Sequence, residues 1–478
     1  MIGTLETLLE SSALWPCDRL KKKLQLTLYL LNLLHYTRYA KPPKLYLQDD
    51  AVNQKLLAKC PLLLQNYHPT WYLTNGHAQT VMVAMGSDEP KIKYTRELLN
   101  LSDGGVVSLD WAERDDGLVY AHNHPTVLLL HGLTGGSSEI YIRMTVAKLM
   151  QNGWRAVVMN ARGCAETPVM TAQLFCAAYT EDVRETVQFL RETHVPTAPL
   201  IAGGFSLGSN ILLKYVAEEG DGCLLNGAIS VGNPYDLLAS NRNLMHSWLQ
   251  NKFYRKALTT NLLNLFFEKS NAHEHFVDHP EIDLDNLKES TSVWDFDERL
   301  TRRVFGYMTV SDYYRDASCS QYLKNIRIPT LCLTAEDDPI SIHTAIPHDD
   351  CLANRHIILA LTEKGGHLGF FTGANVFEFP EMWSSQVFAQ FCDAVNELVS
   401  SPSTSKDSTT PIGRLFRADD SVKIPTEETI VPEPTPATSN ELVPHSVRQL
   451  CILLLSGYVA TALFKRRDIL LKDRRWWY

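Results

Sequence analysis

The chain has 478 residues, of which 45% are hydrophobic, and its formal net charge is −9. This size allows a large hydrophobic core, in one big domain with appendages or in two domains. Because the charge is negative and no basic stripe crosses the centre of the sequence, nucleic acid is excluded as a partner.

The N-terminal segment, residues 1–66, contains one apolar helical stretch. Three lysines at 21–23 precede the apolar run 24–34, which is shorter than the ~20 residues that a bilayer-spanning helix needs. Two interpretations are open: the helix packs on the main domain, or it lies on a membrane surface.

Residues 67–399 have the pattern of one large α/β domain. The stretch 68–80 is rich in turn-forming residues. A hairpin follows, with strands predicted at 95–101 and 106–111 around a turn at 103–105.

Strands and helices then alternate along the chain. Continuous apolar runs predict buried strands at 126–130, 154–160, 199–202, 227–231, 329–334 and 356–361. Helical periodicity predicts helices at 138–152, 181–193, 211–217 and 381–399. This alternation indicates an α/β fold, in which helices cover both faces of a mostly parallel sheet.

The alternation stops over residues 233–328, where the sequence is helical and aromatic. An insertion of this kind between two strands of the sheet predicts a helical cap over the functional site. It contains His273, His275 and His279, and His273 has Asp278 at the spacing of some acyltransferase motifs. A metal site, an acyltransferase motif and a solvated helix end are the three interpretations, and the last is favoured.

The C-terminal part changes character again. Residues 400–446 are rich in Ser, Thr and Pro with almost no apolar pattern, which predicts a disordered linker. The apolar run 450–464 follows and is closed by basic residues at 465–467. We expect residues 447–478 to associate with a membrane, because a helix beyond a disordered linker has no core to pack against. The side of the membrane stays open.

The ten cysteines are scattered and have no CxxC spacing. They indicate free thiols in a reducing compartment rather than a disulfide framework or a zinc site. Together with the terminal apolar runs, they predict an intracellular protein associated with a membrane, at the endoplasmic reticulum or another organelle.

The pattern Gly-x-Ser-x-Gly at residues 204–208 lies between a predicted strand and a predicted helix. In this context a sharp turn lifts the serine hydroxyl group out of the sheet, and the glycines let strand and helix pass closely. Ser206 is therefore the candidate nucleophile. A serine hydroxyl group needs a base within reach and a third group that orients the base.

The two partners are expected at the ends of later strands, in the chain order serine, acid, histidine. Asp338 follows a predicted strand and directly precedes Pro339, so it is the candidate carboxylate. Asp337 is the alternate, and Glu336 comes third. His367 is the candidate base, because glycines on both sides allow its loop to approach the serine.

The oxyanion of the tetrahedral intermediate needs backbone N–H donors that are already in place. One is expected from Leu207 at the start of the serine helix, where the helix dipole helps. The other is expected from Leu133, on the glycine-rich loop at 131–136. His131 precedes the serine in the chain, so we interpret it as a loop-shaping residue. These steps need no metal or organic cofactor.

Several motifs, in their order along the chain, resemble one branch of the α/β-hydrolases. The matching stretches are 75–80, 131–136, 160–163, 204–208, 294–297, 306–307, 337–339 and 366–370. This is the YheT-like branch, which contains the animal abhydrolase-domain proteins one and three and the yeast medium-chain fatty acid ethyl ester synthase/esterases. The resemblance covers roughly residues 67–399.

The resemblance implies a membrane-associated serine hydrolase of acyl esters. It implies substrates among medium-chain esters, acylglycerols and phospholipids, cleaved through an acyl-enzyme. An acyltransferase that passes the acyl group to an alcohol stays open as the alternative, because both reactions share the acyl-enzyme.

Overall fold

The computed structural model describes residues 35–400, apart from 74, 115, 247–249 and 374–378. The apolar runs at 24–34 and 450–464, and the predicted linker beyond residue 400, lie outside the described residues. None of the helices in the described part combines the length and the hydropathy that crossing a bilayer requires.

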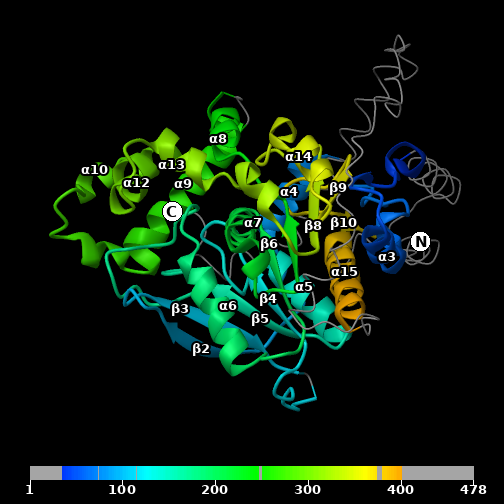
Figure 1. The fold of residues 1–478 in the computed structure, drawn as a ribbon. Coiled ribbons are helices and arrows are strands. Elements are labelled where there is room, and N and C mark those ends of the chain that lie inside the picture. The colour runs from blue at the N-terminus through cyan, green and yellow to red at the C-terminus, as the bar shows by residue number, and fades with distance from the viewer. Residues whose placement is uncertain (1–34, 74, 115, 247–249, 374–378, 401–478) are drawn as a thin grey trace, which may run out of the picture. The chain divides into compact units, whose positions relative to one another are not determined.

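One large sheet forms the centre of the described part (Figure 1). Its strands are β1 (Lys44–Tyr46), β2 (Tyr94–Asn100), β3 (Val106–Ala112), β4 (Thr126–Leu130), β5 (Arg155–Asn160), β6 (Leu200–Phe205), β7 (Gly227–Val231), β8 (Thr330–Ala335) and β9 (Ile357–Thr362). The strand order is β1-β9-β8-β7-β6-β4-β5-β3-β2. Neighbours from β9 to β5 in this order run parallel, whereas β1 is antiparallel to β9, and β3 is antiparallel to both β5 and β2. The prediction of a mostly parallel sheet is confirmed.

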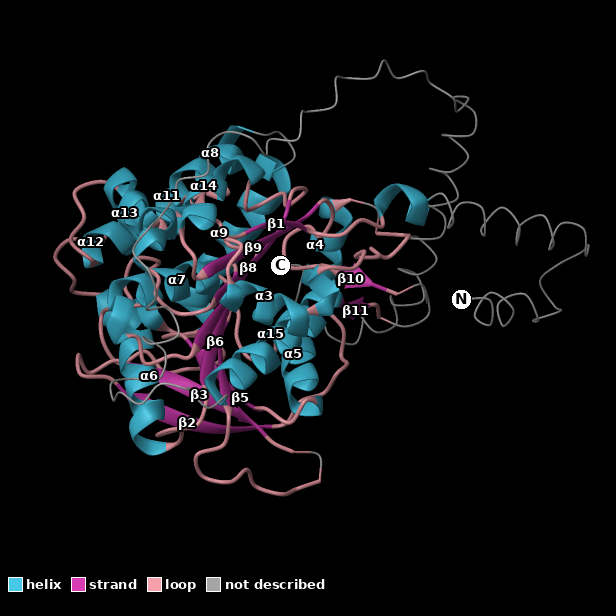
Figure 2. Ribbon diagram, turned by 45° about the vertical axis from the view of Figure 1, so that its right-hand side comes forward, coloured by secondary structure: helices cyan, strands magenta, loops and turns pink. Residues whose placement is uncertain are grey.

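Side chains alternate between the two faces of each strand and so build two cores. Val127 and Leu129 belong to one core, and Leu128 and Leu130 to the other. The first core is covered by α3 (Ala51–Lys59), α5 (Ile140–Gln151) and α15 (Trp383–Ser400), which lie together in Figure 2. The second is covered by α6 (Glu181–Thr193), α7 (Leu207–Glu219) and α14 (His348–Ala353). Helices therefore cover both faces, as the alternation predicts.

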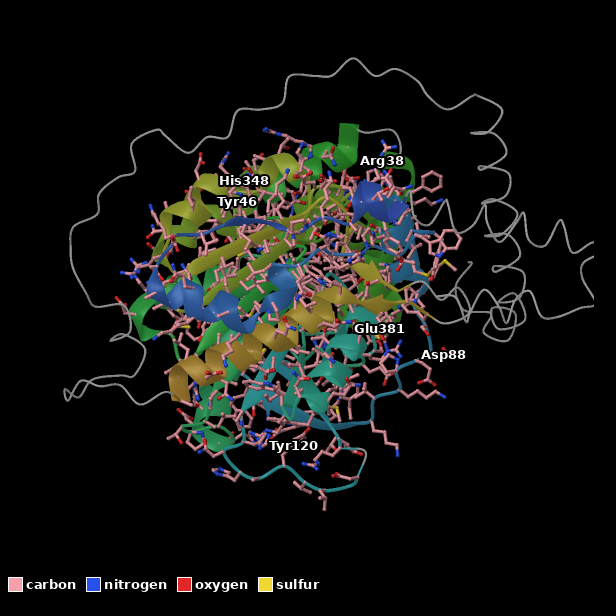
Figure 3. All side chains as sticks on the ribbon, turned by 90° about the vertical axis from the view of Figure 1, so that its right-hand side faces the viewer. Arg38, Tyr46, Asp88, Tyr120, His348 and Glu381 are labelled. Atoms are coloured by element: carbon pink, nitrogen blue, oxygen red, sulfur yellow. The ribbon has the colours of Figure 1, made fainter. Side chains whose placement is uncertain are left out.

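Part of the N-terminal segment belongs to this sheet. Strand β1 pairs with β9 in the register Lys44 with Leu361. The Tyr46 ring lies edge-on to His348, with ring centroids 4.8 Å apart (Figure 3). Helix α3 starts where the Asp50 side chain accepts two backbone N–H bonds. Residues 44–59 thus pack on the main domain, although the boundary predicted from the sequence assigns them to a separate N-terminal segment.

The turn-rich interpretation of residues 75–80 is wrong, because helix α4 (Gly76–Met85) begins there. The Asn75 side chain caps this helix by accepting the backbone N–H of Ala78 at 2.9 Å. Glycine and β-branched residues give the segment little helix propensity of its own. Packing against the main domain therefore decides its conformation.

A helical insertion separates β7 from β8, at the place predicted for the cap. Its elements are α8 (Leu237–His246), η3 (Gln250–Arg255), α9 (Lys256–Asn264), η4 (Leu265–Lys269), η5 (Ala272–Phe276), α10 (Leu284–Lys288), α11 (Val293–Phe296), η6 (Asp297–Thr301), α12 (Arg302–Val304), α13 (Val310–Ala317) and η7 (Cys319–Asn325). Beyond β9, the short strands β10 (Phe371–Thr372) and β11 (Glu381–Met382) form a second sheet. Single turns lie at η1 (Pro61–Leu63), η2 (Gly220–Gly222) and η8 (His343–Ala345).

Candidate active site

Ser206 alone makes the turn between β6 and α7. Its φ of 52° and ψ of −118° are a conformation that residues other than glycine rarely adopt. A Cβ atom on Gly204 would lie 2.4 Å from the Gly208 carbonyl oxygen, and one on Gly208 would lie 2.4 Å from the His131 carbonyl oxygen. The two glycines therefore permit the tight strand-to-helix turn, which holds the serine at the carboxyl edge of the sheet.

His367 lies on the loop after β9 and reaches Ser206. Its Nε2 is 2.8 Å from the Ser206 hydroxyl oxygen, and its Nδ1 is 2.9 Å from an Asp338 carboxylate oxygen. Because the carboxylate can only accept, Nδ1 carries the proton and donates it. Nε2 is then free to accept the serine proton, which is the orientation that a general base requires.

The carboxylate nearest His367 belongs to Asp338, whose side chain is fully buried. Its second oxygen accepts the backbone N–H groups of Ile340 and Ser341, each at 2.8 Å. The alternates face elsewhere. Asp337 accepts the Gly366 N–H at 2.9 Å, and Glu336 pairs with a lysine on β1. The structure thus brings the first-choice carboxylate, and neither alternate, to His367.

The glycine-rich loop after β4 lies beside the serine. A Cβ atom on Gly132 would be 3.3 Å from the Ser206 Cβ, and the Gly132 N–H donates to the Tyr141 hydroxyl oxygen at 3.0 Å. Within the described part of the chain, neither the Leu133 N–H nor the Leu207 N–H donates to a protein acceptor. Their role as donors to a substrate oxyanion stays a prediction.

His131 shapes this loop. Its Nδ1–H donates to the Gly132 carbonyl at 2.7 Å, and its Nε2 accepts the Ala161 N–H at 3.1 Å. Both ring nitrogens are thus engaged, and burial lowers the pKa of the imidazole. His131 is neutral in this arrangement and has no free nitrogen with which to act as a base.

A buried polar cluster anchors the far end of the loop. The Ser137 N–H donates to the Asn160 side chain at 2.9 Å, and the Ser137 hydroxyl donates to Asp110 at 2.5 Å. Asp110 also accepts from Asn160 and from Arg96. Burial alone would raise the pKa of Asp110, but these hydrogen bonds lower it. The charged carboxylate therefore ties β3 and β5 to the loop of Leu133.

Residues 125–374, more than half of the chain, match the model of a family described as alpha/beta hydrolase fold. The chain belongs to the α/β hydrolase fold family. Human phospholipase ABHD3 is 35% identical over 363 residues, which are 75% of this chain and 86% of that protein. A monoacylglycerol lipase of Saccharomyces cerevisiae is 30% identical over 364 residues, 68% of this chain and 81% of that protein. Human monoacylglycerol lipase ABHD2 is 29% identical over 374 residues, 74% of this chain and 86% of that protein.

Another motif of this hydrolase, residues 160–163, has a structural role. The Arg162 side chain is 2% exposed. Its Nε and Nη2 donate to both oxygens of Asp182 at 2.9 and 2.6 Å, and Nη2 also donates to Asp103 at 2.7 Å. This buried fork joins the end of β5 to α6 and to the hairpin turn between β2 and β3.

The cap of this hydrolase packs on both candidate oxyanion residues. One apolar cluster centred on Phe266, Phe276 and Phe296 contacts the Leu133 side chain. A second cluster, which includes Tyr313, contacts the Leu207 side chain. The surroundings of both amides are therefore apolar and aromatic, which suits the acyl chain of an ester.

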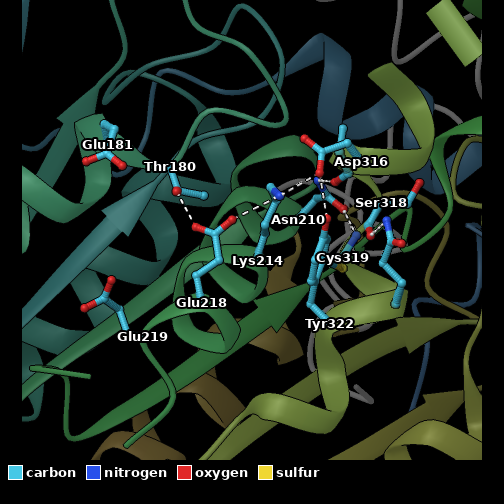
Figure 4. A network of polar contacts seen from close by, with 12 residues as sticks. Thr180, Glu181, Asn210, Lys214, Glu218, Glu219, Asp316, Ser318, Cys319 and Tyr322 are labelled. Atoms are coloured by element: carbon cyan, nitrogen blue, oxygen red, sulfur yellow. Dashed lines mark hydrogen bonds and ion pairs between the residues drawn. The ribbon is translucent and has the colours of Figure 1, made fainter. Parts of the chain in front are cut away.

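Polar contacts fix the cap to the serine helix (Figure 4). On α7, the Asn210 side chain donates to the Ala317 carbonyl at 2.7 Å and accepts the Cys319 N–H at 3.0 Å. One turn later, Lys214 pairs with Glu218 at 3.0 Å and with Asp316 of the cap at 3.3 Å. Ser206, Asn210 and Lys214 are spaced four residues apart, so they lie along one face of α7, and this face carries the cap attachment.

The histidines of the cap do not gather into a metal site. The His273 ring lies tilted against Phe267, with ring centroids 5.5 Å apart, and His279 accepts the Glu281 N–H at 3.3 Å. Among the described residues, no group of three or more His, Cys, Asp or Glu side chains could hold a metal ion.

The site also contains residues to which the sequence analysis gives no role. Thr80 and Gln79 of α4 both accept N–H groups from the His367 loop. The sequence signal that could have placed these two residues on a helix is Asn75, because asparagine is a favoured N-cap residue and lies directly before the helix. The motif at 75–80 carries one histidine, His77, whose Nδ1 lies 2.9 Å from the Tyr254 hydroxyl oxygen.

Proposed function

We propose that this carboxylic ester hydrolase cleaves acyl esters of lipids, with Ser206 as the nucleophile, His367 as the base and Asp338 as the orienting carboxylate. The observation that carries the proposal is the continuous chain of hydrogen bonds from the Asp338 carboxylate through the imidazole to a serine on a strand-to-helix turn. The relatives named phospholipase and monoacylglycerol lipase support lipid esters as the substrate class.

In the first half-reaction, Ser206 Oγ attacks the ester carbonyl carbon while His367 Nε2 takes the serine proton. The carbonyl oxygen becomes an oxyanion and accepts the Leu133 and Leu207 N–H groups. Asp338 stabilises the imidazolium. His367 then gives its proton to the alcohol oxygen, the C–O bond breaks, and the acyl group stays on Ser206.

In the second half-reaction, water takes the place of the alcohol. His367 accepts a proton from this water, whose oxygen attacks the acyl carbon. The same two amides stabilise the second oxyanion. As it collapses, the bond between the acyl carbon and Ser206 Oγ breaks and His367 gives its proton to that oxygen, which releases the fatty acid and restores both Ser206 and neutral His367. The nucleophile, the base, the orienting carboxylate and the two N–H donors of this proposed reaction all belong to the chain itself.

The proposed substrates are acylglycerols or phospholipids, including those with medium-length acyl chains. The apolar clusters beside Leu133 and Leu207 support an acyl chain at this place. Such lipids reside in bilayers, so we propose that the protein acts at an intracellular membrane surface. The apolar runs at 24–34 and 450–464 are the candidate attachment segments.

The test is Ser206→Ala in the full-length protein. We expect turnover of p-nitrophenyl octanoate to fall by at least about 10³-fold, because the residual rate without a nucleophile is small. Labelling by a fluorophosphonate should disappear. Ser385→Ala is the control, since this buried serine of α15 has its hydroxyl 3.1 Å from that of Thr145 on α5. Unchanged labelling of Ser206→Ala would reject the assignment. A lipid mixture is also incubated with the wild-type protein and with Ser206→Ala. A phospholipid or acylglycerol that is consumed only by the wild type identifies the lipid class.

A further inference from the structure

Helix α4 precedes the stretch that matches the hydrolase family, yet it contacts the turn of Asp338 and the loop of His367. A Cβ atom on Gly76 would lie 1.8 Å from the Asp337 carbonyl oxygen. No larger residue fits at this point of contact. The first turn of α4 is therefore wedged against the turn that carries the catalytic carboxylate.

Thr80, on the next turn of α4, holds the backbone of the catalytic histidine. Its hydroxyl group donates to the Gly76 carbonyl at 2.7 Å and accepts the His367 N–H at 2.9 Å. The directions are fixed, because the amide can only donate and the single hydroxyl proton is used by the Gly76 carbonyl. Thr80 is 7% exposed, so water does not readily replace it.

The His367 loop depends on such outside contacts. Leu368 and Phe370 have φ values of 65° and 42°. Backbone in this region is unfavourable for residues other than glycine and persists only where the surroundings impose it. Within the loop, the Gly369 and Phe370 N–H groups both turn back to the Gly365 carbonyl. This tight turn leaves the N–H groups of His367 and Phe371 to be held by other elements.

Gln79 holds the second of these groups. Its side-chain oxygen accepts the Phe371 N–H at 3.1 Å, and its side-chain N–H donates to the Leu73 carbonyl at 3.4 Å. The Phe371 carbonyl accepts the Tyr67 hydroxyl at 2.9 Å. Tyr67, Gln79 and Thr80 thus hold the loop at two points, at His367 itself and at Phe371.

We propose that Thr80 is a positioning residue for the hydrolase reaction, which fixes the His367 backbone so that the imidazole meets Ser206 and Asp338 together. This inference rests on the proposed function, in which His367 is the base. Both imidazole contacts are at hydrogen-bond distance. A displacement of about 1 Å at such a centre can cost on the order of 10²-fold in rate.

The test compares two substitutions of one side chain in the full-length protein. Thr80→Val keeps the shape but removes the hydroxyl group, and Thr80→Ser keeps the hydroxyl group. For p-nitrophenyl octanoate, we expect Thr80→Val to lower kcat by about 10- to 100-fold with KM changed less than about twofold. Thr80→Ser should return kcat to within about threefold of the wild-type value. Rates are normalised to end-point fluorophosphonate labelling, so that unfolded protein does not count.

The control is Thr186→Val in α6. Thr186 is also buried, and its hydroxyl donates to the carbonyl four residues earlier, that of Asp182, at 2.6 Å, but it lies outside the His367 loop. It should keep the wild-type kcat. An unchanged kcat for Thr80→Val, or a Thr80→Ser variant as slow as Thr80→Val, overturns the inference. An active Ser206→Ala would instead defeat the proposed function, whatever Thr80 does.

Discussion

Asp297 in the cap is a buried carboxyl group without a cationic partner among the described residues. It is 7% exposed, and the Tyr314 hydroxyl donates to it at 2.7 Å. Burial raises its pKa from 3.8 to about 6, although hydrogen bonds from Thr301 and Tyr314 act in the other direction. The group therefore resists ionisation at a pH where an exposed aspartate is charged.

This raised pKa predicts a pH-dependent stability. The folded state holds the Asp297 proton more tightly than the unfolded chain, so the contribution is fully present below about pH 4 and is lost as the pH rises through about 6. We expect Asp297→Asn, which cannot ionise, to gain about 3 kcal/mol relative to wild type between about pH 4 and pH 7. Urea unfolding of both proteins across this range measures the difference. Parallel pH curves would show that Asp297 ionises freely in the fold.

At the residue scale, the sequence locates the segments that carry the candidate residues, but it does not show which side chain of a segment faces the site. Strand ends and chain order predict Ser206 and His367 without a competitor. Asp337 and Asp338 are adjacent and chemically identical, so the choice depends on how the turn after β8 points each side chain. Only the structure shows Asp338 facing the imidazole and Asp337 facing the Gly366 amide.

At the scale of elements, the attachment of the cap to α7 depends on Asn210. This fully buried side chain satisfies one carbonyl and one N–H group of the cap backbone. Asn210→Ala leaves both groups buried without a partner, so we expect the free energy of unfolding to fall by about 2–4 kcal/mol. Urea denaturation checks the magnitude, and limited proteolysis checks the location.

Asn53→Ala is the matched control for Asn210→Ala. Asn53 is also buried, and its side chain donates to two backbone carbonyls: that of Gln48, just before α3, at 2.9 Å, and that of Arg355, far along the chain, at 3.1 Å. Both variants should be less stable, but only Asn210→Ala should cleave faster within residues 233–328. Equal cleavage there in the two variants would mean that Asn210 does not anchor the cap.

Among the elements that escape prediction, α4 and β1 do so for a common physical reason. Both are short, and neither has the periodicity from which an element is recognised. Strand β1 has only three residues, and α4 contains glycine, histidine and threonine in its first turns. Each is stabilised by a partner far away in the sequence, so its conformation cannot be seen in its own residues.

At the scale of the whole molecule, the core that α15 covers includes residues that precede the predicted domain. Leu56 of α3 is 2% exposed and belongs to the core that α15 covers. Leu64, only eight positions later, is 56% exposed. We expect Leu56→Ala to lower the free energy of unfolding by about 2–5 kcal/mol and Leu64→Ala to change it by less than about 0.5 kcal/mol.

Chemical denaturation of these two variants tests whether residues 51–59 are part of the main domain. If α3 were an appendage, as a boundary after residue 66 implies, Leu56→Ala would be as harmless as Leu64→Ala. The pair has the same chemistry and differs in burial alone. A mild effect of both substitutions would therefore restore the boundary that the sequence suggests.

The fold class follows from the sequence, because a chain of alternating strands and helices is compatible with few architectures. The order of the strands in the sheet does not follow from it. Apolar runs locate β4, β5 and β6, but nothing in them shows that β4 lies between the other two. That order depends on crossovers and on long-range packing. The same limit applies to the cap, whose composition predicts helices but not the side chains that meet Leu133 and Leu207.

The grip of residues 67–80 on the His367 loop also has a consequence for biosynthesis. Tyr67 and Phe371, which are joined by a hydrogen bond, are 304 positions apart in the sequence. Strand β1 pairs with β9, which is synthesised after an even longer stretch of chain. A nascent chain that has emerged only as far as the serine helix has neither its base nor the partner of its first strand. Closing such distant contacts is slow and leaves apolar surface uncovered meanwhile. We therefore expect catalytic competence to arise late, after synthesis has passed β10, and chaperones to matter most before that point.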